Sequence, residues 1–193
     1  MIEVEFKKFW NSNFNQTIPL SYLFKEVYHE RWLRFHSLPD SKRYPESDNE
    51  MNIILQRYNQ IFSEIYNENE EIYLVHTNIT HNDEKFELLN FHSELNFKKS
   101  CSFKLKMYFP NDFDNDAILE VFVSRKCWKL NSYNEILKEI VNDISRFFFI
   151  SLDSKIIVAP YDGGIDIILK SETDKAILTK KYKNWISKRI DKL

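Results

Sequence analysis

The stretch PYDGGIDIIL, residues 160–169, contains the only two glycines of the chain, Gly163 and Gly164. Average usage near 7% would give roughly a dozen glycines in a chain of this length, so the pair points to a local backbone requirement. An apolar run at 156–158 precedes the pair, and alternating apolar residues follow it. Asp-Gly between two such runs favours a two-residue type I′ turn, whose central residues have positive φ. The stretch therefore predicts a C-terminal β-hairpin that turns at Asp162-Gly163.

Three other segments combine a helix-capping signature with apolar residues at helical spacing. A serine followed three residues later by an acidic residue occurs at 47–50, 132–135 and 171–174. Such a pair satisfies backbone N–H groups at the start of a helix. Behind each pair, apolar residues recur at intervals of three and four, which places them on one helix face. The sequence predicts three amphipathic helices over about residues 47–66, 132–146 and 171–186.

Short β-branched or aromatic runs lie around these helices, bounded by Asn, Asp or Pro. We expect strands at 32–36, 71–77, 102–109, 118–124, 147–150, 156–159 and 165–169. The order lacks strict β-α-β alternation, which favours an α+β fold with an antiparallel or mixed sheet and about three helices packed on one side of it. No linker or repeat is visible, so we expect one globular domain over residues 1–193, in which 1–31 form a helical lead-in.

Composition excludes several classes of protein. The 193 residues are 43% hydrophobic, and 27 basic and 29 acidic residues give a net charge of −2, so a polyanion such as nucleic acid is an unfavoured partner. The longest apolar runs are too short for a membrane span, and the N-terminus lacks the apolar centre of a signal peptide, so we expect a cytoplasmic protein without a membrane partner. Cys101 and Cys127 lie far apart, and we interpret them as reduced, partly buried thiols.

The densest polar and aromatic segment is WLRFHSLPDSKRYPE, residues 32–46. Alternation along a strand places Arg34 and His36 on one face. Two prolines then stiffen a loop that presents Arg43, beside Tyr44, to a carboxylate or phosphate. The structural alternative is that Arg34 and His36 form buried hydrogen bonds with neighbouring carboxylates while the loop merely leads into the helix.

The sequence predicts no catalytic set, no metal and no cofactor. His76 and His81, spaced by five, lack the closer pairing and third ligand of a zinc site. No serine or cysteine has the setting of a nucleophile. Asp162 and Asp166 flank the glycines as an acid/base pair would, but we favour turn chemistry, in which Asp162 bonds its own turn and Asp166 alternates outward.

Four segments together carry a resemblance to a known family. They are WLRFHSLPDSKRYPESDNE at 32–50, ILEVFVSRKCW at 118–128, PYDGGIDIIL at 160–169 and KYKNWISKRIDKL at 181–193. On these segments the chain resembles bacterial domain-of-unknown-function family 3885. The resemblance implies an α+β domain in the cytoplasm, and it implies no catalytic role.

These observations favour a binding protein over an enzyme. We expect a soluble protein that binds another protein, in the form of an immunity protein that neutralises a cognate bacterial toxin by occlusion. The alternative is a small hydrolase or transferase with Arg34, His36 and Arg43 around a phosphate-bearing or acidic substrate; a nucleic-acid-binding module with a basic C-terminus is third. The predicted binding residues are polar or aromatic: Trp32, Arg34, His36, Arg43, Tyr44, Tyr161 and Asp162, with Asp112, Asp114 and Asp116 for a basic nuclease toxin.

Overall fold

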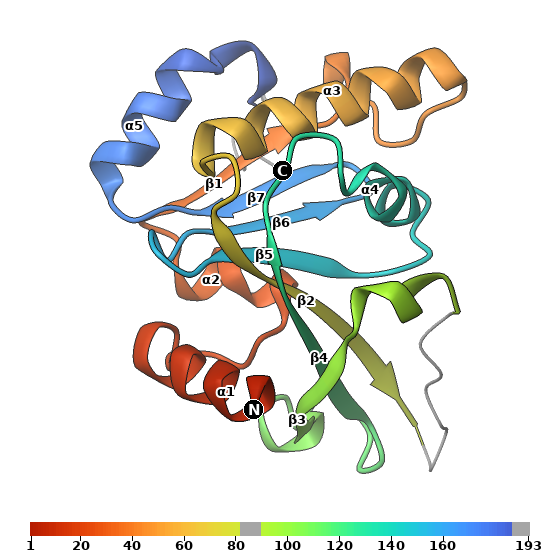
Figure 1. The fold of residues 1–193 in the computed structure, drawn as a ribbon, viewed down its shortest axis with the longest axis vertical. Coiled ribbons are helices and arrows are strands. Elements are labelled where there is room, and N and C mark those ends of the chain that lie inside the picture. The colour runs from red at the N-terminus through yellow and green to blue at the C-terminus, as the bar shows by residue number, and fades with distance from the viewer. Residues whose placement is uncertain (82–89, 187–193) are drawn as a thin grey trace.

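The computed structural model describes residues 1–81 and 90–186, which form a seven-stranded antiparallel sheet between two layers of helices (Figure 1). The sheet order is β1-β7-β6-β5-β2-β4-β3, and every neighbouring pair is antiparallel. The strands are β1 Trp32–His36, β2 Glu71–Thr80, β3 Lys98–Lys104, β4 Ile118–Cys127, β5 Phe147–Ser151, β6 Ile157–Tyr161 and β7 Gly164–Ile168. The α-helices of the described ranges are α1 Ile2–Asn13, α2 Phe24–Val27, α3 Asp48–Ile65, α4 Asn134–Val141 and α5 Glu172–Lys181. Short 3-10 helices lie at Ser21–Leu23, Pro39–Ser41, Asn90–Leu95, Leu105–Met107 and Lys183–Trp185.

Helices cover both faces of the sheet, so the expectation of one covered side is wrong. Helices α3, α4 and α5 pack on one face, and α1 and α2 pack on the other (Figure 1). The second layer comes from the N-terminal lead-in, whose helices bury aromatic side chains such as Phe6, Trp10 and Phe24. Strand β5 is buried along its whole length, as a strand covered on both faces must be.

Two of the three predicted helix caps are confirmed. The Ser47 hydroxyl accepts a hydrogen bond from the Glu50 N–H, and Ser171 accepts one from Asp174. The third is wrong: α4 starts after Tyr133 without a side-chain cap, although four residues of its predicted apolar stripe are buried, namely Ile136, Leu137, Ile140 and Val141. This helix ends at Val141, which leaves Ile144 61% exposed.

The strand predicted at 102–109 is wrong in its second half. Strand β3 ends at Lys104, and the N–H groups of Tyr108 and Phe109 bond back to the carbonyl of Leu105. That closes a 3-10 turn over a buried leucine instead of continuing the ladder.

The hairpin is confirmed and its turn type is wrong. Tyr161 pairs with Gly164, which leaves Asp162 and Gly163 as the two-residue loop. Neither glycine has positive φ, so the turn is not type I′. Contact explains the glycines instead, because a Cβ on Gly164 would lie 2.3 Å from the carbonyl oxygen of Phe35 in β1. A Cβ on Gly163 would lie 3.1 Å from the ring of Tyr161.

Helix α3 closes the hairpin from the opposite layer. The Tyr58 hydroxyl lies 2.6 Å from the carbonyl oxygen of Tyr161 and 2.8 Å from that of Gly164, so it shares its hydrogen between them. Burial raises the pKa of Tyr58 well above its ordinary value, which keeps the hydroxyl a donor at any physiological pH.

Cys101 and Cys127 are free thiols, as expected, and only the first is partly buried, because Cys127 is exposed. Burial raises the pKa of the Cys101 thiol. Within the described ranges no helix offers an apolar stretch long enough to cross a bilayer.

Replacing Gly164 by alanine should destabilise the protein more than the same change at Gly163. The new methyl group at 164 meets backbone, which cannot rotate away, whereas at 163 it meets the side chains of Tyr161 and Arg43. We expect Gly164→Ala to cost about 1–3 kcal/mol, as overpacking does, in urea denaturation. Equal costs for the two variants would contradict the contact explanation.

Candidate functional site

The candidate site lies on the α1/α2 face of the sheet, on the row of residues that crosses β1, β7 and β6. In that row Arg34 pairs with Asp166, and Asp166 pairs with Ala159. The neighbouring row, Trp32, Ile168 and Ile157, is largely apolar. Ala159 has a small side chain, so a hollow remains above the row with the charged pair, whereas the larger side chains of the apolar row leave none there.

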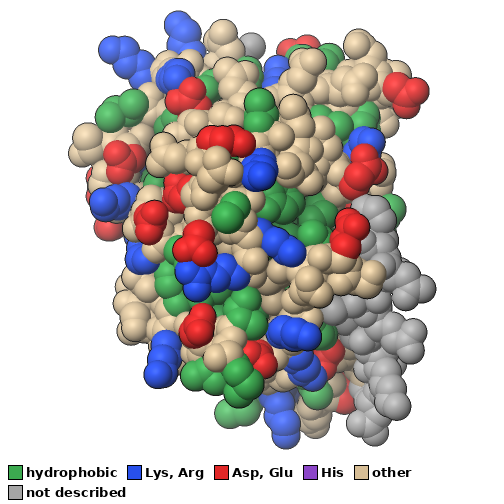
Figure 2. Space-filling view, viewed as in Figure 1, with side chains coloured by type: hydrophobic (Ala, Val, Ile, Leu, Met, Phe, Trp, Pro, Cys, Tyr) green, Lys and Arg blue, Asp and Glu red, His purple; other side chains and the backbone are tan. Residues whose placement is uncertain are grey.

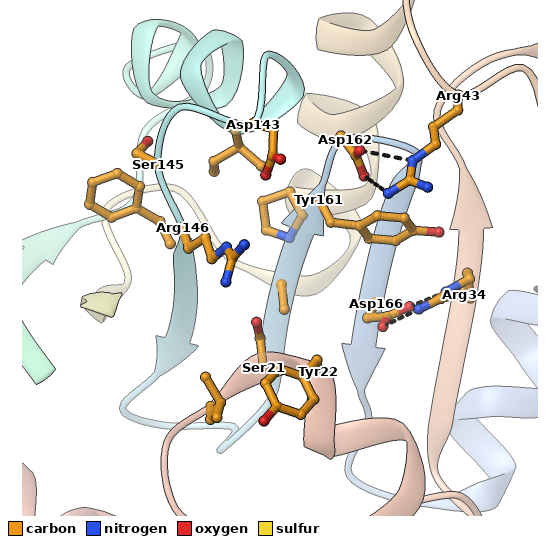
Figure 3. Close-up of a pocket in the computed structure, with 15 residues that line it drawn as sticks. Ser21, Tyr22, Arg34, Arg43, Asp143, Ser145, Arg146, Tyr161, Asp162 and Asp166 are labelled. Atoms are coloured by element: carbon orange, nitrogen blue, oxygen red, sulfur yellow. Dashed lines mark hydrogen bonds and ion pairs between the residues drawn. The ribbon is translucent and has the colours of Figure 1, made fainter. Parts of the chain in front are cut away.

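A cavity of about 330 Å³ occupies this hollow. Its walls come from the sheet, from the 3-10 segment at Ser21–Leu23 and from the loop between α4 and β5 (Figure 3). The polar side chains that line it are Ser21, Tyr22, Arg34, Arg43, Asp143, Ser145, Arg146, Tyr161, Asp162 and Asp166. Its size is at the small end of ligand sites, which run from about 300 to 1,000 Å³.

Arg34 and Asp166 form a buried ion pair with two parallel hydrogen bonds. Nε lies 2.6 Å from Oδ1, and the second nitrogen lies 2.8 Å from Oδ2. The two side chains are 15% and 8% exposed. Burial alone would lower the pKa of Arg34, but the hydrogen bonds and charge of Asp166 raise it overall, so the pair stays charged.

Arg43 and Asp162 form a second bidentate pair at the hairpin tip. The two hydrogen bonds measure 2.8 and 3.1 Å, and they raise the pKa of Arg43. Asp162 is buried at 7% exposure, whereas Arg43 is 61% exposed. The guanidinium also lies 5.3 Å from the ring centre of Tyr44. Arg43 is therefore held in one orientation while most of its surface faces solvent.

Tyr161 separates the two pairs. The Arg34 guanidinium lies 4.6 Å from the centre of its ring, within the range of a cation–π contact. Burial raises the pKa of Tyr161, so its hydroxyl is neutral and able to donate.

Arg146 enters the cavity from the α4–β5 loop (Figure 3). Its backbone is fixed by neighbouring β2. The Arg146 carbonyl oxygen accepts a hydrogen bond from the Thr77 N–H at 3.2 Å and lies 3.0 Å from His76 Nδ1. Within the described ranges its guanidinium has no hydrogen bond or ion pair. A second cavity, of about 300 Å³, lies against the same arginine and shares Leu20, Asp143 and Ser145 with the first.

The structure brings together four of the predicted site residues, Arg34, Arg43, Tyr161 and Asp162, as lining of one cavity. Two more flank them: Trp32 lies 5.3 Å from the Arg34 guanidinium, and Tyr44 lies beside Arg43.

The other four predicted residues lie outside this lining. His36 is 9% exposed at the end of β1. Asp112, Asp114 and Asp116 lie before β4, where Asp112 helps raise the pKa of Tyr22, after the larger effect of burial. Asp116 lies 3.8 Å from His81.

Turn chemistry is the wrong explanation for the two hairpin aspartates. Asp162 bonds Arg43 instead of its own turn, and Asp166 is 6% exposed and bonds Arg34 instead of facing outward. The structural alternative for Arg34, a buried hydrogen bond to a carboxylate, is confirmed. Throughout 1–81 and 90–186, no three His, Cys, Asp or Glu side chains are grouped to hold a metal ion.

Sequence reasoning missed the residues that come from two irregular segments. They are Ser21 and Tyr22 before α2, and Asp143, Ser145 and Arg146 after α4. One signal was available for the second group. Arg146 directly precedes the buried strand Phe147–Ser151, and polar residues at the end of a buried strand usually lie outside the core.

The fold and site define an α+β protein with helices on both faces of an antiparallel sheet and a polar cavity beside its C-terminal hairpin. The chain belongs to the family described as "Domain of unknown function (DUF3885)", which matches residues 20–189. The expected family is thereby confirmed. No curated protein and no solved structure matches the chain.

Removing the Arg34 side chain should lower the free energy of unfolding of the protein. Arg34→Ala leaves the buried Asp166 carboxylate without its partner, so we expect a loss of about 3–5 kcal/mol in urea denaturation. Arg125→Ala is the matched control, because Arg125 forms an equally bidentate pair with Glu71 whose members are 43% and 52% exposed. That variant should lose at most about 1 kcal/mol. Similar losses would show that the Arg34 pair contributes no more than a surface pair.

Proposed function

We propose that this protein binds a partner protein through the rim of the cavity, and that the partner is a bacterial toxin that it neutralises by occlusion. The rim is defined by four exposed side chains: Tyr22, Arg43, Tyr44 and Ile144. Tyrosine and arginine are the residue types that supply most binding energy in protein interfaces. Ile144, which is exposed between the lining residues Asp143 and Ser145, adds apolar area.

One observation carries the proposal: Arg43 is exposed and already held in place. Its bidentate bond to the buried Asp162 and its contact with Tyr44 fix a long side chain that would otherwise lose rotamer freedom on binding. Ordering such a side chain costs about 0.5–1.5 kcal/mol at an interface, so a preorganised arginine retains more of its contact energy.

The same geometry disfavours the hydrolase or transferase alternative. That alternative requires Arg34 and Arg43 as an anion clamp and His36 as the acid or base. Each arginine is already bound by an aspartate, and His36 does not line the cavity.

The face of the molecule in Figure 2 disfavours a nucleic-acid partner. Basic and acidic side chains alternate across it, and no extended field of positive charge appears (Figure 2). Binding to a phosphate backbone depends on such a field.

Tyr44→Ala should weaken the complex while leaving the fold intact. The ring is 52% exposed, so its removal costs little stability, whereas a central interface tyrosine contributes about 2 kcal/mol or more, about 30-fold in affinity. Titration calorimetry against the product of the adjacent reading frame measures this. Tyr108→Ala is the control, since Tyr108 is 50% exposed and lies outside the rim. Equal affinities of the Tyr44→Ala and Tyr108→Ala variants for the partner would show that the rim is not part of the interface.

Co-expression tests the toxin as partner. The product of the adjacent reading frame should arrest growth when expressed alone, and this protein should restore growth and remain bound to it on a column. Tyr44→Ala should restore growth less well than Tyr108→Ala. A harmless neighbour, or one that is not retained, contradicts the immunity proposal.

A further inference from the structure

Arg146 differs from the other arginines of the described structure. Arg34, Arg43 and Arg125 each form a bidentate ion pair, Arg57 donates to the carbonyl oxygen of His36, and Arg31 lies over the ring of Tyr28. Across the described ranges, Arg146 alone has no hydrogen bond, ion pair or ring contact for its guanidinium. Figure 3 shows it reaching toward the space that Ser21, Tyr22 and Tyr161 enclose.

The chemistry of a free guanidinium points to an oxyanion. Its planar fork of N–H groups matches the two oxygens of a carboxylate or phosphate. Ser21, Tyr22 and Tyr161 line the same cavity, and the Ser21 hydroxyl points toward Arg146, where it can donate a hydrogen bond to a bound oxyanion (Figure 3). Because the backbone of Arg146 is fixed, its side chain has fewer orientations to lose when a ligand binds.

The remaining lining is apolar. Leu20, Ile140, Phe147, Ala159 and Pro160 contribute to the walls of the cavity. A volume of about 330 Å³ admits a small organic molecule whose apolar body lies on these side chains.

The charges of the lining limit the charge of the ligand. Three arginines and three aspartates line the cavity, and two of each neutralise one another as Arg34–Asp166 and Arg43–Asp162. Arg146 and Asp143 remain, on the same loop. A ligand carboxylate can pair with Arg146, whereas a second negative charge would add to that of Asp143 with no further unpaired cation in the lining.

We infer that the cavity beside Arg146 is a binding site for a small organic monocarboxylate, held by its carboxylate on Arg146 and by its apolar body on Leu20 and Pro160. The site does not depend on the proposed partner protein, because the described chain supplies every group of it.

The test is a titration of the isotope-labelled protein alone with benzoate, followed by NMR through the Arg146 Nε–Hε signal. We expect saturable shifts with a dissociation constant of about 1 mM or tighter, within the range for a ligand of this size. Benzamide has the same shape without charge, and inorganic phosphate at pH 8 carries a second charge. Each should bind at least about 10-fold more weakly.

Variants assign the binding to Arg146. Arg146→Gln should weaken benzoate binding by about 10-fold or more, since it removes the charge. Its melting temperature should not change, because the guanidinium has no partner within the described structure. Arg125→Gln, the control, should bind as the unmodified protein does. The inference is overturned by any of four results: no saturation up to about 20 mM benzoate, equal binding of benzamide, equal or tighter binding of phosphate, or unchanged binding by the folded Arg146→Gln protein.

Discussion

Gly164 carries no side chain, and the backbone of β1 lies where one would be, since a Cβ there would come within 2.3 Å of the Phe35 carbonyl oxygen. This close approach sets the register that places Arg34 opposite Asp166. The contact continues past the end of β1, where the Ser37 N–H donates to the carbonyl of Gly163. The loop that follows carries Arg43 to Asp162. Both arginine–aspartate pairs therefore depend on a glycine that neither of them touches.

Those pairs determine the shape of the site more than they determine its stability. Burying two charges has a desolvation cost that often offsets their attraction, so a buried pair is weak evidence for a net gain in stability. Its geometry is nevertheless restrictive, because a bidentate bond fixes both the distance and the plane of the guanidinium. Arg34 then fixes the ring of Tyr161 at 4.6 Å, and the cavity has one rigid wall formed by three strands.

Local signals predicted the elements that local chemistry determines. Helices α3 and α5 have serine caps that act within four residues, and the Asp-Gly hairpin forms within two. The pairing of Arg34 with Asp166 spans 132 residues, and no pattern in the sequence indicates which carboxylate an arginine will meet. The prediction of the turn type was wrong for the same reason. The close approach of β1 requires a glycine at 164, and local turn propensity contains no information about a neighbouring strand. The helical lead-in was predicted, but its place on the second face of the sheet was not; α1 begins at Ile2, and its N-cap Met1 makes no side-chain cap.

The rim and the cavity lie on the same elements, and this links the two proposed binding events. Tyr22 belongs to the rim and also lines the cavity, and Arg43 lines the cavity with its buried side while its outer surface faces solvent. A partner protein that covers the rim would therefore contact or enclose a carboxylate on Arg146. Linkage requires that each of the two then changes the affinity of the other by the same factor. The sign follows from charge: a partner that presents a basic side chain over the cavity favours the bound carboxylate, and an acidic one competes with it for Arg146.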